Sequence, residues 1–143
     1  MAMNIKYRLV SILETEYKFN YDFDFRSINP ESVSMQIGHA MKPAMEEDCI
    51  TVSMKVNVVH TETNTILATN AISMIFGLSP IKKILSYDSN GSVTTQSSEI
   101  LDTFITATMG ALRGVLMKNL KGTPLSFVVI PLIPIEKLKA ASE

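Results

Sequence analysis

Few residues of this chain could carry out acid–base or nucleophilic chemistry, and their spacing does not assemble a catalytic set. The two histidines, His39 and His60, each fall near the end of a predicted strand, and we expect structural or solvated roles for them. Asp22 and Asp24 could be paired carboxylates for acid–base work. Their i,i+2 spacing beside Arg26 is instead typical of the polar face of a strand.

The cysteine and the remaining acidic residues give no better case for catalysis or metal binding. Cys49 is the only cysteine and has no His or Lys beside it in the sequence, so an activated thiolate lacks support. One cysteine and two histidines cannot form a Cys/His zinc site without carboxylates, and the acidic run Glu46-Glu47-Asp48 lies in a predicted turn. Motifs for phosphate binding, dinucleotide binding and hydrolytic nucleophiles are missing. We expect a protein that is not an enzyme and holds no cofactor and no metal.

The composition limits the kinds of partner. A chain of 143 residues fits one domain, so residues 1–143 are expected to fold as a unit. A net charge of −1 lacks the basic excess that nucleic-acid binding requires. Because 46% of the residues are hydrophobic and 19% are charged, disorder is excluded and a surface for self-association is expected.

The sequence predicts a cytoplasmic protein. Its N-terminal apolar stretch, from Leu9 to Leu13, is interrupted by Ser11 and is too short for the apolar region of a signal peptide. No run of about 18 apolar residues occurs, so no membrane span is expected. A single cysteine fits a reducing compartment.

Period-two alternation predicts four strands. It has no exception in residues 17–26, where aromatic residues take every odd position, and the preceding residues 5–13 are expected to be extended too. Residues 33–37, 50–58 and 65–77 supply the other three strands. Short connections favour antiparallel neighbours in a meander, and the alternation indicates that one face of the sheet is buried.

One long amphipathic helix is predicted after the strands. It begins at Ser97 or Ser98 and ends near Leu120, with Gly122 as the stop. Its principal apolar stripe is Leu101, Phe104, Ile105, Thr108, Leu112, Val115 and Leu116. The helix is apolar on more than this side, so a second subunit is expected to cover an oligomer interface of Ile100, Phe104, Ala107, Gly110, Ala111, Gly114 and Met117.

The segment after Pro124 is apolar, but Pro131 and Pro134 interrupt it, which predicts an extended tail and not a central strand. A short helical turn is expected over residues 135–141. The predicted fold class is therefore α+β: a four-stranded antiparallel β-meander, then one long C-terminal helix and an extended, proline-broken tail.

This order of elements resembles the SecB protein-export chaperone family over nearly the whole chain. Residues 7–22 resemble the family's first strand, and residues 32–77 resemble the next three, with Glu47-Asp48 before the strand that begins at Ile50. Ile100-Leu101, Arg113 and Leu116 resemble the family helix. The sequence Gly122-Thr123-Pro124-Leu125, followed by Pro131 or Pro134, resembles its tail.

The resemblance implies an ATP-independent holdase that binds extended apolar segments of unfolded or nascent polypeptides and forms a homo-oligomer, either a dimer or a dimer of dimers. An apolar strand exit that leads into a polar loop, together with the aromatic face, gives the expected substrate-binding residues: Phe76, Leu78, Ile81, Ile84, Leu85, Tyr17, Phe19 and Tyr21. SecB proteins are typically strongly acidic, which helps them dock the SecA motor. A net charge of −1 gives SecA docking no support here.

Two other interpretations remain open. The first is a dedicated interaction subunit on the same fold, with one specific antitoxin-like or phage-encoded partner. The second is a small-ligand or acyl-group enzyme of hot-dog type, although that fold places its helix early. The sequence also leaves open whether Met35, Met54 and Met74 and the aromatic face fill the core or form a docking surface.

Overall fold

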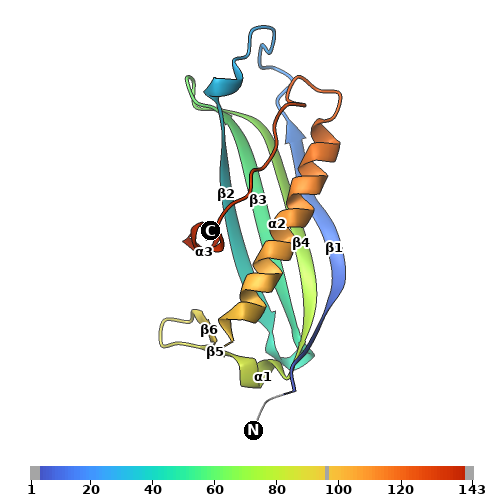
Figure 1. Cartoon of the computed structure of the whole chain (residues 1–143), viewed down its shortest axis with the longest axis vertical. Helices are drawn as coiled ribbons and strands as arrows, with labels where there is room; N and C mark the ends of the chain where they lie inside the picture. Colours follow the sequence, from blue (N-terminus) through green and yellow to red (C-terminus); the bar gives the residue numbers. More distant parts are fainter. Residues whose placement is uncertain (1–3, 96, 141–143) are drawn as a thin grey trace.

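The computed structural model describes residues 4–95 and 97–140, which form an antiparallel sheet with one long helix lying along it (Figure 1). The sheet consists of β1 (Lys6–Phe19), β2 (Val33–Ala44), β3 (Cys49–His60) and β4 (Thr65–Ser79). The long helix is α2 (Ser98–Leu120). The shorter elements are η1 (Pro30–Ser32), η2 (Met45–Glu47), α1 (Ile81–Ile84), β5 (Leu85–Tyr87), β6 (Val93–Thr95) and α3 (Ile135–Ala140). The α+β class and the order of strands before helix are as predicted.

The strand order, β1-β4-β3-β2, corrects one part of the predicted meander. β2, β3 and β4 follow one another through short turns, but β1 pairs with β4 and not with β2. The connection over residues 20–32 makes this possible. β1 and β2 lie three strand spacings apart, which is about 14 Å, and an extended segment as long as residues 20–32 can span roughly 40 Å.

The first strand lies earlier in the sequence than its alternation predicts. β1 covers the residues expected only to be extended and ends at Phe19, so most of residues 17–26 is not strand. The pairing register explains this end, because Phe19 lies opposite Ala68 and β4 begins at Thr65. Beyond Phe19 the chain has almost no partner strand left, and a period-two pattern without a partner does not form a strand.

The core lies between the sheet and α2. Phe104 of α2 stacks on Phe76 of β4 with ring centroids 4.1 Å apart and an interplanar angle of 9°. All of the predicted helix stripe is buried except Val115, which is half-buried. Met54 and Met74 are core residues, whereas Met35 is half-buried. The stripe therefore positions α2 over β3 and β4 as its spacing predicts.

The C-terminal tail packs beside α2 and is tied to it by polar contacts. Arg113 donates from Nε to the carbonyl oxygen of Ile130 (2.7 Å) and from Nη2 to that of Pro131 (2.8 Å). Lys139 Nζ in α3 lies 2.7 Å from Asp102 Oδ1 in the first turns of α2. These contacts hold the tail, extended as predicted, next to the helix.

By length and composition alone, α2 could cross a membrane, and it is the one such helix among the described residues, although no span was expected from its sequence. The core helix of a soluble protein can have the same length and composition. In this chain the apolar stripe of α2 packs against the sheet.

A polar cluster around the buried side chain of Asn70 fixes α2 and β1 relative to β4. Asn70 is fully buried, and its Nδ2 donates to Glu14 Oε2 and to the carbonyl oxygen of Glu16, both at 2.9 Å. Asn119 of α2 donates from Nδ2 to Glu14 Oε2 (2.6 Å) and to Asn70 Oδ1 (3.0 Å). Buried polar groups stabilise a structure only when they are satisfied, so this cluster favours one placement of the helix.

Replacing Asn70 tests that assignment. Asn70→Ala removes donors from the Glu14 carboxylate and leaves a cavity, so we expect the free energy of unfolding to fall by about 1–3 kcal/mol. Gln36→Ala, at an exposed position of β2, is the matched control and should change it by less than about 0.5 kcal/mol. Urea unfolding measures both. Equal effects of the two substitutions would contradict the assignment.

Candidate functional site

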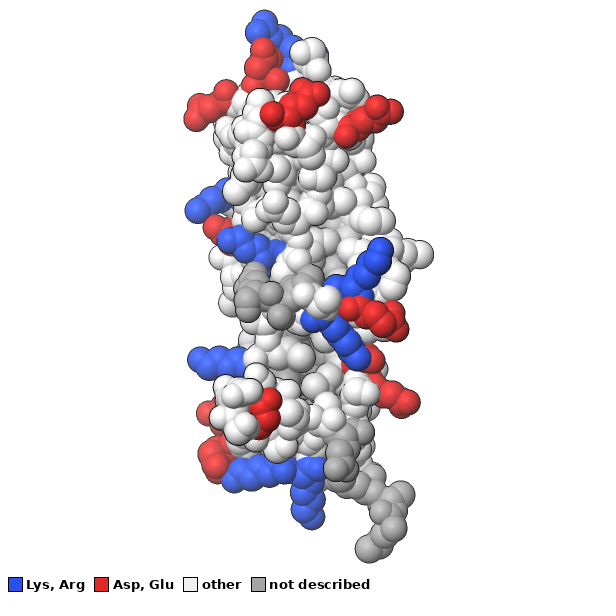
Figure 2. Space-filling model, turned by 90° about the vertical axis from the view of Figure 1, so that its left-hand side faces the viewer, with Lys and Arg blue, Asp and Glu red and all other residues white. Residues whose placement is uncertain are grey.

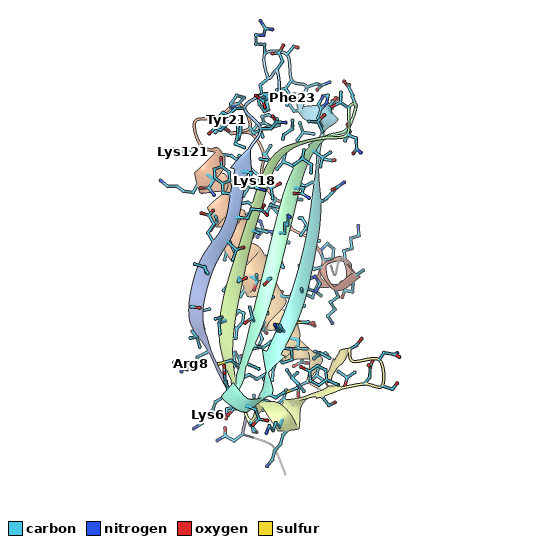
Figure 3. The ribbon with its side chains drawn as sticks, turned by 180° about the vertical axis from the view of Figure 1, so that it is seen from behind. Lys6, Arg8, Lys18, Tyr21, Phe23 and Lys121 are labelled. Carbon is cyan, nitrogen blue, oxygen red and sulfur yellow. The ribbon has the colours of Figure 1, made fainter. Side chains whose placement is uncertain are left out.

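The segment from Phe19 to Phe25, here called the aromatic loop, gathers four aromatic side chains at one end of the sheet. Ring centroids are 5.0 Å apart for Phe19 and Tyr21, 5.3 Å for Phe19 and Phe25, and 5.0 Å for Phe23 and Phe25. Phe23 also lies 5.0 Å from the ring of His60 at the end of β3. Figure 3 shows Tyr21 and Phe23 beyond the end of β1. The alternating aromatic residues after Phe19 therefore do not extend β1 but form an aromatic cluster at its end.

Local hydrogen bonds shape this loop. The Asn20 backbone N–H donates to Leu67 O (2.9 Å), its Nδ2 donates to Ile66 O (3.1 Å), and its Oδ1 accepts from the Asp22 N–H (3.0 Å). Arg26 donates from Nε and Nη2 to the Asp24 carboxylate, each at 2.9 Å, and holds the pKa of that carboxyl below its usual value. Asp24 is therefore paired with Arg26, whereas Asp22 takes part in these contacts through its backbone, and neither residue lies on the strand expected from the sequence.

A small apolar pocket lies between the aromatic loop and the segment after α2. It has a volume of about 240 Å³ and is lined by Phe19, Tyr21, Phe25, Gly122, Thr123 and Pro124. Gly122 has φ +81°, a conformation that favours glycine, and it turns the chain out of the helix. Small-molecule sites usually measure about 300–1,000 Å³, so the size of this pocket suits one side chain better than a whole metabolite. Tyr21 is 85% exposed at its rim.

A second apolar region lies along β1 and α2 and is here called the β1–α2 surface. β1 is an edge strand, and Tyr7, Leu9 and Ile12, which lie opposite core residues of β4 on the α2 side of the sheet, are each about half exposed. A groove of about 530 Å³ runs beside it, lined by Ile12, Glu14, Gly110, Ala111, Gly114, Val115, Lys118 and Asn119. A long edge strand with exposed apolar side chains is an association site.

Five of the expected substrate-binding residues are core residues. Phe76, Leu78, Ile81, Ile84 and Leu85 are each 5% exposed or less, because α1 and the end of β4 pack under the sheet–helix core. They are too deep to form the rim of a groove, which corrects that expectation. A strand exit that is apolar throughout is also what a buried strand end requires, so the pattern alone does not distinguish the two.

The aromatic candidates lie at the surface. Phe19 and Tyr21 line the apolar pocket. Tyr17 is 36% exposed, and its hydroxyl donates to the carbonyl oxygen of Asn119 (3.2 Å) while burial raises the pKa of its phenol. Phe25 and Pro124 complete the pocket and were missed, because nothing in the sequence brings residues 19–25 next to the end of α2.

The expected oligomer interface is mostly at the surface as well. Ala107, Gly110, Gly114 and Met117 are exposed, and Ile100 and Ala111 are half-buried. Phe104 is 1% exposed and belongs to the core of its own chain. The apolar residues of β1 were missed as partners of this face. Their signal was present in the run from Leu9 to Leu13, which is apolar on both faces of a strand.

The titratable residues considered for chemistry occupy separate places. His39 is buried within β2 and not at its end, while His60 ends β3 and lies 2.8 Å from Thr63 Oγ1 through its Nδ1. Cys49 opens β3 and is half-buried. Across the part of the chain that the structure describes, no three His, Cys, Asp or Glu side chains gather as a metal site would require.

Comparison with known proteins identifies the fold. No protein-family model and no curated protein sequence matches the chain. Among solved structures, it is similar to the SecB-like chaperone of Mycobacterium tuberculosis, determined in complex with a ChAD peptide from the HigA1 antitoxin. The superposition has a TM-score of 0.58, covers 90% of each chain and relates sequences that are 8% identical. The antiparallel sheet with its long helix is thus a SecB-like fold.

Proposed function

We propose that this chain is a SecB-like, ATP-independent holdase of the cytoplasm, which binds extended apolar segments of unfolded or nascent polypeptides. The observation that carries the proposal is the apolar pocket of the aromatic loop, with Tyr21 exposed at its rim. The SecB-like fold and the peptide bound by the mycobacterial neighbour support a peptide-binding role. The proposed activity is binding without a chemical step and does not include docking to SecA.

The size of the pocket predicts how such binding works. One buried apolar side chain contributes about 1.5–3 kcal/mol, which is too little for a stable complex. Several pockets presented by one oligomer would act on the same client chain and raise its apparent affinity without any new contact. The holdase function therefore depends on self-association.

The β1–α2 surface is the proposed site of that self-association. It combines the free edge of a strand of 14 residues, exposed apolar side chains and the small residues of α2, which permit close approach. A second subunit would cover this surface in a dimer, and a dimer of dimers would bring more pockets together. Pairing along β1 would also satisfy backbone groups at the sheet edge.

The mycobacterial neighbour's complex with an antitoxin peptide also favours the second candidate, a dedicated subunit with one specific partner. Pull-down from the protein's own host separates the two. A single stoichiometric band favours the dedicated subunit, and a broad range of clients favours the holdase. The hot-dog enzyme is not proposed, because the helix follows the strands and the fold is SecB-like.

Removing the exposed ring of the pocket should weaken client binding. We expect Tyr21→Ala to raise the dissociation constant of a fluorescein-labelled apolar peptide about tenfold in fluorescence anisotropy, since roughly 1.4 kcal/mol of contact is lost. Tyr87→Ala, which removes a 53% exposed ring from β5, is the matched control and should leave the affinity unchanged. Failure of the unmodified protein to bind the peptide or to suppress aggregation of a reduced, unfolded client would refute the proposal.

A charge on the β1–α2 surface should dissociate the oligomer. Ile12 is 51% exposed and lines the groove, and Ile12→Glu would place a carboxylate in the proposed apolar interface, so size-exclusion chromatography with light scattering should show monomers. Ile66→Glu, at a 49% exposed position of β4, is the control and should leave the oligomer intact. A monomeric unmodified protein, or dissociation by the control alone, would rule out this interface.

A further inference from the structure

The face of the sheet opposite α2 is open, and its charges are strongly biased. No described helix covers this face, which Figure 3 shows from the front. Residues paired across strands point to the same side, so the register assigns Arg8, Gly77, Cys49 and Ala44 to one row of the open face. The charged residues at open-face positions of the four strands are Lys6, Arg8, Glu16, Lys18, Lys42 and Lys55.

The only acidic residue among these positions is already neutralised. Glu16 lies 3.2 Å from Lys18 Nζ and 3.3 Å from Lys55 Nζ, and these two lysines hold the pKa of its carboxyl below the usual value. Lys6, Arg8 and Lys42 form no ion pair with another described residue. A chain with a net charge of −1 thus presents a cationic face. Figure 2 shows this face in profile along its left-hand edge, where Lys and Arg side chains project at several heights and Asp and Glu side chains project near the top and the bottom.

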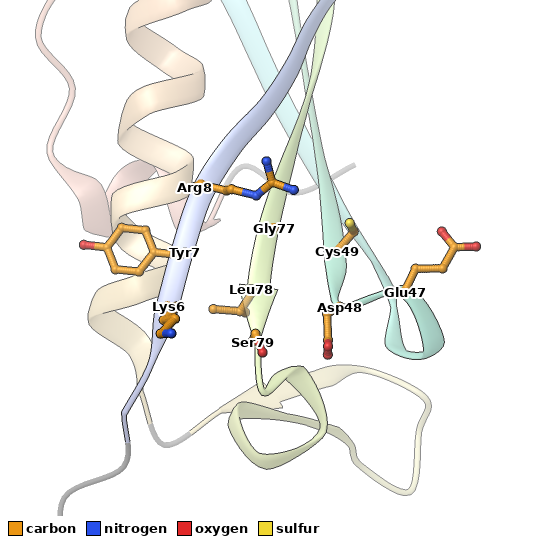
Figure 4. A pocket seen from close by; sticks show the side chains of 9 residues that line it. All are labelled: Lys6, Tyr7, Arg8, Glu47, Asp48, Cys49, Gly77, Leu78 and Ser79. Atoms are coloured by element: carbon orange, nitrogen blue, oxygen red, sulfur yellow. The ribbon is translucent and has the colours of Figure 1, made fainter.

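Arg8 is held flat against the sheet. Its side chain crosses β4 over Gly77 toward Cys49 (Figure 4), and a Cβ at residue 77 would lie 3.3 Å from Arg8 Cγ. Gly77 therefore provides the space for this position. A pocket of about 340 Å³ beside it is lined by both Lys6 and Arg8 together with Glu47 and Asp48. Asp48 Oδ1 accepts a hydrogen bond from the Ile81 N–H (3.2 Å), and both acidic residues are exposed beside the two cations.

The floor between the cations carries short polar side chains, together with the aliphatic side chains of Leu13 and Ile75. Ser53 Oγ lies 2.9 Å from Ser73 Oγ, and Thr69 Oγ1 donates to Asn57 Oδ1 (2.7 Å). No aromatic residue stands at an open-face position of the described strands, so bases of a single-stranded nucleic acid would find nothing to stack on. Backbone and short acidic side chains of a polypeptide can approach such a floor closely.

We propose that the open face of the sheet is a docking surface for an acidic polypeptide segment of a partner protein. The segment would lie across the strands with its carboxylates near Arg8 and Lys42, which form no ion pair with another described residue. This surface is separate from the aromatic loop, and it shares the edge strand β1 with the β1–α2 surface. A partner could therefore recruit the protein while the apolar pocket holds a client.

Titration with an acidic probe tests the proposal. The full chain is mixed with a fluorescein-labelled peptide of alternating Glu and Ser, and the dissociation constant is measured by anisotropy at low and high salt. We expect salt-sensitive binding that Lys42→Glu weakens about tenfold, because one attraction becomes a repulsion. Lys121→Glu makes the same change of charge just beyond α2 and should have little effect. Lys42 lies on β2, far from the β1–α2 surface, so the oligomeric state and the binding of an apolar peptide should not change.

Three results would overturn the proposal. The acidic peptide could fail to bind, or Lys42→Glu and Lys121→Glu could weaken it equally, which would indicate a general charge effect. A single-stranded DNA of equal charge could bind more tightly and lose affinity in Lys42→Glu, which would make this a nucleic-acid surface. Tyr21→Ala is expected to lose affinity for the apolar peptide and to keep its affinity for the acidic peptide. Each of the two proposals can therefore fail without the other.

Discussion

A single helix covers only part of one face of a four-stranded sheet, and this constraint determines most of the surfaces of the molecule. A helix is about 10–12 Å wide, whereas the outer strands of such a sheet are about 14 Å apart. α2 lies over β3 and β4, and the tail fastened by Arg113 lies beside it. The side chains of β1 at the edge stay exposed, and the opposite face stays open. The regions proposed above to bind partners are those that the helix leaves uncovered.

The three uncovered regions differ in chemistry and position. The aromatic loop forms a small apolar pocket, the β1–α2 surface is apolar along a strand edge, and the charged residues of the open face are mostly cationic. Apolar contacts supply affinity, whereas charges supply orientation and partner selection. The sites proposed for client binding, self-association and partner docking therefore differ in chemistry.

The sequence predicted the helices and strands better than it predicted which of them lie side by side. The stripe of α2 and the alternation in β2, β3 and β4 follow from local periodicity, and the structure confirms them. The pairing of β1 with β4 depends on a connection that crosses the sheet, which no local pattern records. The aromatic residues after Phe19 alternate as a strand does, but β4 offers them no partner, so they form the loop. The sequence predicts Phe76 and Leu78 at a groove rim, but they lie in the core, because apolar residues at a strand end suit both places.

Hydrogen–deuterium exchange with a bound client tests the central claim, that the aromatic loop receives apolar polypeptide, most directly. The protein is compared alone and saturated with a reduced, unfolded client, at the same oligomeric state. Backbone amides of residues 19–25 and 122–125 should exchange more slowly in the complex, because the client covers the pocket that these segments build. Slower exchange confined to the strands of the sheet, or no change in the aromatic loop at saturation, would contradict the claim.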